Sequence, residues 1–190
     1  QLRSPKKKKN RFRAKLLKAG TMTSYSEGPL GSILSDNRGV AWDDGAHDNV
    51  QTIRIYYHAL GINTVQFEYR DGTKGDEHGN RRPDPETEKM QKFSLEEDEY
   101  LTMTYVESGL IGIKNILFQT NKRRMGCGVN PNDLIYSQEV ADAFGSTDGK
   151  TKIVGFHGIY GNQFLHKIGV HWAPVYMSED KSTPIEAAII

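Results

Sequence analysis

The stretch "GFHGIYGNQFLHKIGVHW", residues 155–172, contains a turn and the two flanking segments from which the fold can be argued. After the turn, Ile168, Val170 and Trp172 alternate with other residues, as in a strand with one buried face. The turn itself, "GNQFLH" at 161–166, begins with glycine and does not alternate. The stretch therefore predicts two strands joined by a polar and aromatic turn, with Trp172 in the core.

The same period of two recurs through most of the chain. It is seen in Ile53, Ile55 and Tyr57; Val65, Phe67 and Tyr69; Leu101, Met103 and Tyr105; and Lys114, Ile116 and Phe118. Turn chemistry separates these runs: "RDGTKGDEHGN" (70–80) predicts a hairpin, and the two prolines of "RRPDPETE" (81–88) exclude a central strand. "SQEVADAF" (137–144) predicts a single helical turn at most. The pattern is typical of an all-β sandwich, barrel or prism.

Charge is distributed unevenly along the chain. Residues 1–20 hold nine bases and no acid, whereas the remaining residues hold sixteen bases and twenty-four acids, a net charge of −8. An acidic body has no electrostatic attraction to nucleic acid, so only the basic lead could bind it. We expect residues 1–27 to be a disordered basic lead, because the segment has nine bases and little to bury. The alternative is a tag, because "GPLGS" (28–32) is similar to the remnant of a cleaved tag.

Composition bounds the class of protein. The chain has 190 residues, a mean hydropathy of −0.63 and no apolar run long enough for a membrane span. Cys127 is the only cysteine, which excludes an intrachain disulfide, and "MGCG" (125–128) predicts an ordinary thiol in a loop. No apolar stretch follows the first basic residues as in a secretory signal. We therefore expect a cytoplasmic protein, with the nucleus as a second compartment.

Three clusters have the residue types of catalytic or metal sites. They are Asp43 and Asp44; His157, His166 and His171; and Glu96, Glu97, Asp98 and Glu99. Neighbouring strand residues point to opposite faces, so the aspartates should not converge and should instead bond backbone amides. The histidines have no cysteine or acid at ligand spacing, and the glutamate run is typical of a solvated charge run. We therefore expect no metal, no cofactor and no enzyme activity.

Five short segments follow one another in order along the chain. They are "WDDG" (42–45), "FEY" (67–69), "GDEHG" (75–79), "FQTNK" (118–122) and "GFHG" (155–158). Together they resemble the jacalin-related lectins, and the plant mannose-binding members in particular. The resemblance implies a β-prism I fold, with three four-stranded antiparallel Greek-key sheets related by a pseudo-threefold axis. It divides the chain into a lead (1–27), a lectin domain (28–178) and a tail (179–190).

The resemblance also implies a metal-free carbohydrate site in loops at one end of the prism. In the family, a turn ending Gly-x-x-x-Asp holds the sugar, with help from a glycine before the "WDDG" segment and from a third loop. Carried over to this chain, the site residues are Gly39, Glu107, Ser108, Gly161, Asn162, Gln163, Phe164, Leu165 and His166. Glycines allow the main chain to approach a sugar closely, and a carboxylate would accept charge-assisted hydrogen bonds.

The chain departs from the family motif at the last of these positions. His166 stands where the family has aspartate, and the turn is one residue longer. A neutral histidine offers one donor and one acceptor, so Asn162 and Gln163 would supply hydrogen bonds and Phe164 a stacking face. Two hypotheses remain open: a lectin for mannose-type or galactose-type glycans, and a protein-interaction module of the same fold with a degraded sugar site. The candidate partners are glycans, another protein and further copies of the chain in a homo-oligomer.

Overall fold

In the part that the structure describes, the chain consists of strands joined by turns and loops. The computed structural model describes residues 24–32, 39–81, 87–128 and 140–175, which contain twelve strands and no helix. The strands are β1 (Tyr25–Gly31), β2 (Val40–Asp43), β3 (Val50–His58), β4 (Gly61–Tyr69), β5 (His78–Gly79), β6 (Lys89–Ser94), β7 (Leu101–Ser108), β8 (Ile113–Thr120), β9 (Arg124–Gly128), β10 (Val140–Gly145), β11 (Thr151–Tyr160) and β12 (Leu165–Pro174). The described ranges therefore contain no helix that could span a membrane.

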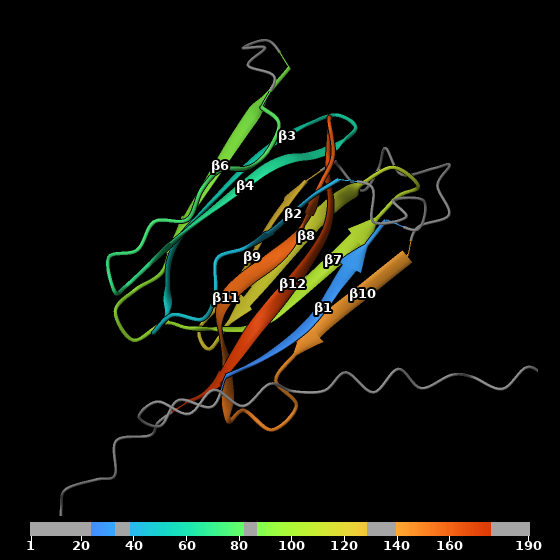
Figure 1. The fold of residues 1–190 in the computed structure, drawn as a ribbon. Helices are drawn as coiled ribbons and strands as arrows, with labels where there is room; N and C mark the ends of the chain where they lie inside the picture. The colour runs from blue at the N-terminus through green and yellow to red at the C-terminus, as the bar shows by residue number, and fades with distance from the viewer. Residues whose placement is uncertain (1–23, 33–38, 82–86, 129–139, 176–190) are drawn as a thin grey trace, which may run out of the picture.

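The strands form two antiparallel sheets, drawn in Figure 1. The smaller sheet has the order β5-β4-β3-β6. The larger has eight strands in the order β1-β12-β11-β7-β8-β9, with β2 added beside β11 and β10 beside β7. In the described residues, β11 and β7 share a single register pair, Ile153 with Leu101. The larger sheet therefore consists of two groups of four strands, β2-β11-β12-β1 and β10-β7-β8-β9, joined at one point.

The alternating residues meet in one core between the sheets. Ile53, Ile55, Val65 and Phe67 are fully buried, as the period of two predicted, and Trp172 is 1% exposed. At the centre, the Phe156 ring of β11 stacks on Phe67 of β4 at 4.0 Å and meets the edge of Phe118 at 6.0 Å. One aromatic cluster thus joins the smaller sheet to both halves of the larger one.

Strand β7 departs from the predicted alternation. Leu101, Met103 and Tyr105 were expected on one face, but a register shift against β8 falls between Leu101 and Met103. Beyond it the phase is reversed: Thr104 and Val106 are buried, and Met103 and Tyr105 are only half-buried. An extra residue in one strand of a pair exchanges its two faces, which the amino-acid pattern did not reveal.

Two further sequence predictions are wrong at strand level. The stretch expected to make a helical turn contains β10, which pairs along its length with β7. At the other end, β1 begins at Tyr25, inside the stretch assigned to the lead, and Leu30 and Gly31 pair with β12. The "GPLGS" segment is therefore part of the fold, while residues 1–23 lie outside the described ranges.

Asp43 and Asp44 point to opposite sides of the chain, as predicted. Asp43 is 60% exposed and accepts from the Gly45 amide at 2.8 Å. The Asp44 carboxylate is nearly buried, and its partners are side chains instead of the expected backbone amides. The Tyr69 hydroxyl donates to Asp44 at 2.9 Å, and His78 Nε2 lies 2.6 Å from the other oxygen. Asp44 thus ties the end of β2 to β4 and β5.

This difference predicts unequal costs for removing the two carboxylates. Asp44→Ala would leave the Tyr69 hydroxyl and His78 Nε2 without their acceptor in a buried place, so we expect a loss of about 2 kcal/mol in the free energy of unfolding. Asp43→Ala, the matched control, should cost less than about 1 kcal/mol because water replaces its contacts. Urea unfolding of both variants checks this, and equal losses would contradict the assignment of faces.

Candidate functional site

The turn between β11 and β12 exposes two amide side chains. β11 ends at Tyr160 and β12 begins at Leu165. The Gly161 amide donates to the Phe164 carbonyl at 2.9 Å and closes the turn, leaving Asn162 and Gln163 in solvent. Asn80 Nδ2, just after β5, donates to the Asn162 carbonyl at 3.1 Å. The turn is therefore held in place from both sheets and presents Asn162 and Gln163 outward.

Phe164 and Leu165 do not belong to the surface of this turn. They are 4% and 0% exposed, so the predicted stacking face is wrong. The Phe164 ring meets the His58 ring edge-on at 5.3 Å. A methyl carbon added at Gly61 or Gly112 would lie 3.3 Å or 2.6 Å from Phe164. The phenyl ring is buried between the β3–β4 and β7–β8 turns. Sequence alone could not show whether it packs inside the protein or forms an exposed stacking surface.

His166 folds back over Gly161. A methyl carbon added at Gly161 would lie 2.3 Å from both Cε1 and Nε2 of the imidazole, so only glycine leaves room for the ring here. The His166 backbone is fixed at the same time, because its carbonyl accepts from the Ser32 amide at 2.9 Å. The residue in the position of the family aspartate thus covers the backbone at the start of the turn.

Gly39 lies beside this turn, as the resemblance implied. Val40, at the start of β2, pairs with Tyr160 at the end of β11. A methyl carbon added at Gly39 would lie 2.5 Å from the Tyr160 carbonyl oxygen. Gly39 and Gly161 are therefore neighbours across the end of one strand. Gly39 allows close approach of the Tyr160 main chain, and Gly161 leaves room for the His166 ring.

The third loop reaches the turn through residues that the sequence comparison did not select. Glu107 is half-buried and accepts from Asn115 Nδ2 at 2.6 Å, and Ser108 is 1% exposed, so both lie within the hairpin. The tip of the loop is Leu110 and Ile111, 48% and 57% exposed. The Ser32 hydroxyl donates to the Leu110 carbonyl at 2.5 Å and ties this tip to the end of β1. In the sequence, the exposed tip could have been recognised from the apolar pair between the glycines of "GLIG" (109–112).

Exposed aliphatic side chains surround the turn. Leu60, at the tip of the β3–β4 turn, is 65% exposed, and Val40 is 54% exposed. Gly61 and Gly112 both contact Phe164, so the tips with Leu60 and with Leu110 and Ile111 flank the same turn. Figure 1 shows the β3–β4 and β11–β12 turns together at the upper end of the molecule. We call this end, with Gly161–His166 at its centre, the turn end.

Comparison with known proteins places this geometry in a family. The model of the Jacalin-like lectin domain matches residues 28–171, which is most of the described chain. The chain belongs to the jacalin-like lectin family. Jacalin-related lectin 33 of Arabidopsis thaliana is 32% identical over 168 residues, covering 83% of this chain and 51% of the relative. Jacalin-related lectin 36 of the same plant is 33% identical over 156 residues, with 77% and 31% covered.

Solved structures agree on the fold of this jacalin-like chain. The mannose-binding lectin from Champedak superposes with a TM-score of 0.64 at 24% identity, covering 82% of this chain and 99% of that one. Single-chain recombinant jacalin gives 0.64 at 23% identity, with 82% and 97% covered. The chain spans about half, or less, of the length of the curated relatives described above.

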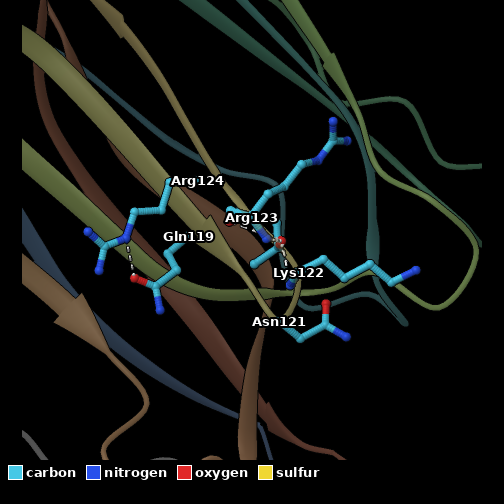
Figure 2. Close-up of a pocket in the computed structure, with 6 residues that line it drawn as sticks. Gln119, Asn121, Lys122, Arg123 and Arg124 are labelled. Atoms are coloured by element: carbon cyan, nitrogen blue, oxygen red, sulfur yellow. Dashed lines mark hydrogen bonds between the residues drawn. The ribbon is translucent and has the colours of Figure 1, made fainter.

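A pocket at the opposite end of the jacalin-like domain is a weaker candidate. It is formed by the β8–β9 turn, and Figure 2 shows its lining residues Gln119, Asn121, Lys122, Arg123 and Arg124. Its cations already have partners: Lys122 contacts Glu96 and Asp98, Arg123 contacts Glu99, and Arg124 donates to Gln119 at 2.9 Å. Carboxylates therefore neutralise two of the three cations, which leaves Arg124 as the charge available to an anionic ligand.

The remaining chemical candidates have structural roles. Cys127 lies in β9 instead of a loop, and burial raises the pKa of its thiol to about 12, so it stays protonated and unreactive at neutral pH. The described residues contain no group of three or more His, Cys, Asp or Glu placed to hold a metal. Of the three histidines, His157 and His171 lie together, 5.1 Å between ring centroids, whereas His166 is at the turn.

Proposed function

We propose that this jacalin-like domain binds carbohydrate, without metal and without chemistry on the ligand, at the turn end. The observation that carries the proposal is the closed turn that exposes Asn162 and Gln163 next to the neighbouring glycines 39 and 161. Sugar hydroxyls need donors and acceptors at fixed positions, and a short turn provides them at low entropic cost. The names of the relatives, jacalin-related lectins, support the same function.

We infer a β-prism of three four-stranded sheets as the scaffold of this site. The single register pair between β11 and β7 supports it, because separating the larger sheet there gives two further four-stranded units beside β5-β4-β3-β6. Sheets that share only one residue pair are free to turn away from one another. The turn end would then be one end of the prism.

The ligand we propose is larger than a monosaccharide. With His166 in place of aspartate, the turn lacks a carboxylate to accept hydrogen bonds from a pair of sugar hydroxyls. The flanking tips with Leu60, Leu110 and Ile111 offer apolar contact area beyond the turn. A branched glycan would use both, and mannose-type and galactose-type glycans are the two classes to test. Several sites in a homo-oligomer would strengthen such binding further.

A protein-interaction module with a degraded sugar site is less well supported. It rests on the departure at His166 and on relatives such as Myrosinase-binding protein 1 of Arabidopsis thaliana, 30% identical over 151 residues. Against it, the turn keeps two solvent-exposed amides on a fixed backbone. A protein partner, like a cytoplasmic or nuclear location, is an expectation to be tested alongside the glycan.

The test of the proposed function is a glycan array followed by isothermal titration. The full chain should bind at least one glycan on the array. The variant with both Asn162→Ala and Gln163→Ala should bind the same glycan much more weakly. Binding should survive addition of a chelator. A chain that binds no glycan, or a double variant that binds like wild type, would contradict the proposal.

A second variant tests the role assigned to His166. His166→Asp restores the family carboxylate, and one charge-assisted hydrogen bond contributes roughly 1.5–3 kcal/mol. We therefore expect monosaccharide affinity to rise about 10-fold to 100-fold in titrations with mannose and galactose. Thr147→Asp, in the exposed β10–β11 connection at the other end of β11, is the matched control for the added charge. An unchanged His166→Asp variant would mean that the sugar does not reach this position.

A further inference from the structure

A serine, a histidine and an aspartate from three strands form a hydrogen-bonded chain away from the turn end. The Ser26 hydroxyl of β1 lies 3.0 Å from His171 Nδ1 of β12. On the other side of the ring, His171 Nε2 lies 2.6 Å from the Asp43 carboxylate of β2. Neither the proposed glycan binding nor the core of the protein requires this arrangement.

Strand pairing brings the three residues to the same face of the sheet. Ser26 is directly opposite His171 in the β1–β12 register, and Gly155 of β11 is opposite His171 on the other side. Gly155 has no side chain, which allows the Gly45 carbonyl to approach β11 with the imidazole beside it. A methyl carbon at Gly155 would be 1.8 Å from the Gly45 oxygen and 3.3 Å from the ring. The geometry is thus built by the register of four adjacent strands.

The order of the hydrogen bonds fixes which nitrogen carries the proton. Asp43 can only accept when ionised, so the neutral ring donates from Nε2 and presents the lone pair of Nδ1 to Ser26. Burial alone would raise the pKa of Asp43, but hydrogen bonds from the Gly45 amide and from His171 outweigh it and the pKa is lowered. The carboxylate is therefore ionised at neutral pH, as this tautomer requires.

The surroundings place a buried imidazole beside an accessible hydroxyl. His171 is 8% exposed, whereas Ser26 is exposed to solvent. The neighbouring His157, whose Nε2 lies 3.1 Å from the Glu27 carbonyl, has a pKa lowered by burial and then by the proximity of His171. A base buried beside an exposed hydroxyl can remove its proton while a reagent approaches from solvent.

We propose that Ser26 is a base-activated nucleophile that forms a covalent adduct with acyl and phosphonyl electrophiles. Its oxygen attacks the electrophilic carbon or phosphorus, and its proton passes to His171 Nδ1. With an ester, the bond from the acyl carbon to the leaving oxygen breaks and His171 returns the proton to that oxygen. With a fluorophosphonate, the phosphorus–fluorine bond breaks and fluoride leaves. Asp43 acts as a positioning residue that fixes the tautomer of His171.

The experiment is labelling of the full chain with a fluorophosphonate probe, read by intact mass and peptide mapping. Ser26 should react about 100-fold faster than Ser94, an exposed serine of the edge strand β6, because general-base assistance is worth at least that much. Ser26→Ala should remove the adduct.

Two variants separate an activated serine from a merely exposed one. Asp43→Asn keeps the shape of an exposed side chain but removes the charge that fixes the tautomer, and it should slow labelling about 10-fold or more. His171→Gln should slow the labelling of Ser26 about 100-fold. If His171→Gln does not fold, the labelling rate of Asp43→Asn tests the proposal instead. An absent Ser26 adduct, equal rates at Ser26 and Ser94, or full labelling of Asp43→Asn would each overturn the proposal.

Discussion

Gly161→Val is expected to abolish glycan binding without unfolding the domain. The first atom of the new side chain would lie 2.3 Å from the His166 imidazole, so the ring must leave its place over the turn. The valine and the displaced ring would also crowd the space beside the turn that a sugar has to enter. Both changes act on the same face of the turn, and we expect affinity to fall about 100-fold or more, or about 3 kcal/mol.

The fold should tolerate this change because the displaced group is a half-buried side chain at the surface. The hydrogen bond from the Gly161 amide to the Phe164 carbonyl involves only backbone and can persist. Thermal unfolding should therefore change little. Gly126→Val is the matched control: Gly126 is exposed on β9, and a methyl carbon there meets its nearest atom at 3.7 Å.

Titration against the glycan with the highest array signal measures the effect. His166→Ala, tested in parallel, shows how much of the loss follows from removing the imidazole alone. If Gly161→Val binds that glycan as wild type does, the ligand lies away from this turn and the proposed site is wrong.

Most of the strands could be predicted because burial of one strand face produces an alternating apolar pattern in the sequence. Wherever one face of a strand packs into the core, as at Ile53, Ile55, Val65 and Phe67, apolar residues recur with a period of two. The prediction failed where pairing departs from regular geometry, as at the Leu101–Met103 bulge. It also failed in β10, where a helical turn had been expected from the sequence.

The site could be predicted only in outline. The resemblance implied a site at Gly39, Asn162 and Gln163, and these residues lie together at one turn. That they bind a sugar stays a prediction. The directions of Phe164 and Ser108 could not be predicted, since they depend on contacts with residues far away in sequence. The chain of Ser26, His171 and Asp43 was missed for the same reason, because residues 26 and 171 meet only through strand pairing.

Glu99 shows how a charge run can conceal a buried group. "EEDE" at 96–99 was interpreted as a solvated run, and Glu96, Glu97 and Asp98 are exposed, but Glu99 is 0% exposed. Its carboxylate accepts from Arg123 Nε at 2.9 Å and from the Thr120 hydroxyl at 2.8 Å. It also accepts from the Glu96 amide at 3.0 Å. Glu99 therefore ties the segment before β7 to the β8–β9 turn.

Glu99→Ala should be the most destabilising of the substitutions considered. It leaves the Thr120 hydroxyl and the Glu96 amide without their acceptor, and Arg123 without its carboxylate. Breaking a buried ion pair costs 3–5 kcal/mol, and the partial exposure of Arg123 to solvent places this case at the lower end, about 3 kcal/mol. The midpoint of thermal unfolding should fall by roughly 10 °C. Glu97→Ala, in the exposed part of the same run, should change it little.

The same carboxylate gives stability a defined dependence on pH. Burial alone would raise the pKa of Glu99, but hydrogen bonds from Arg123, the Glu96 amide and Thr120 lower it from 4.5 to about 2. A pKa lowered by folding means that the stabilisation is complete above pH 4.5 and is lost as pH falls toward 2. Glu99→Gln removes the titrating group, so the difference in unfolding free energy between wild type and Glu99→Gln should be constant from pH 7 to 5 and shrink below pH 4.5. Urea unfolding at each pH measures it, and a difference that stays constant down to pH 2.5 would mean that Glu99 is not held by these contacts.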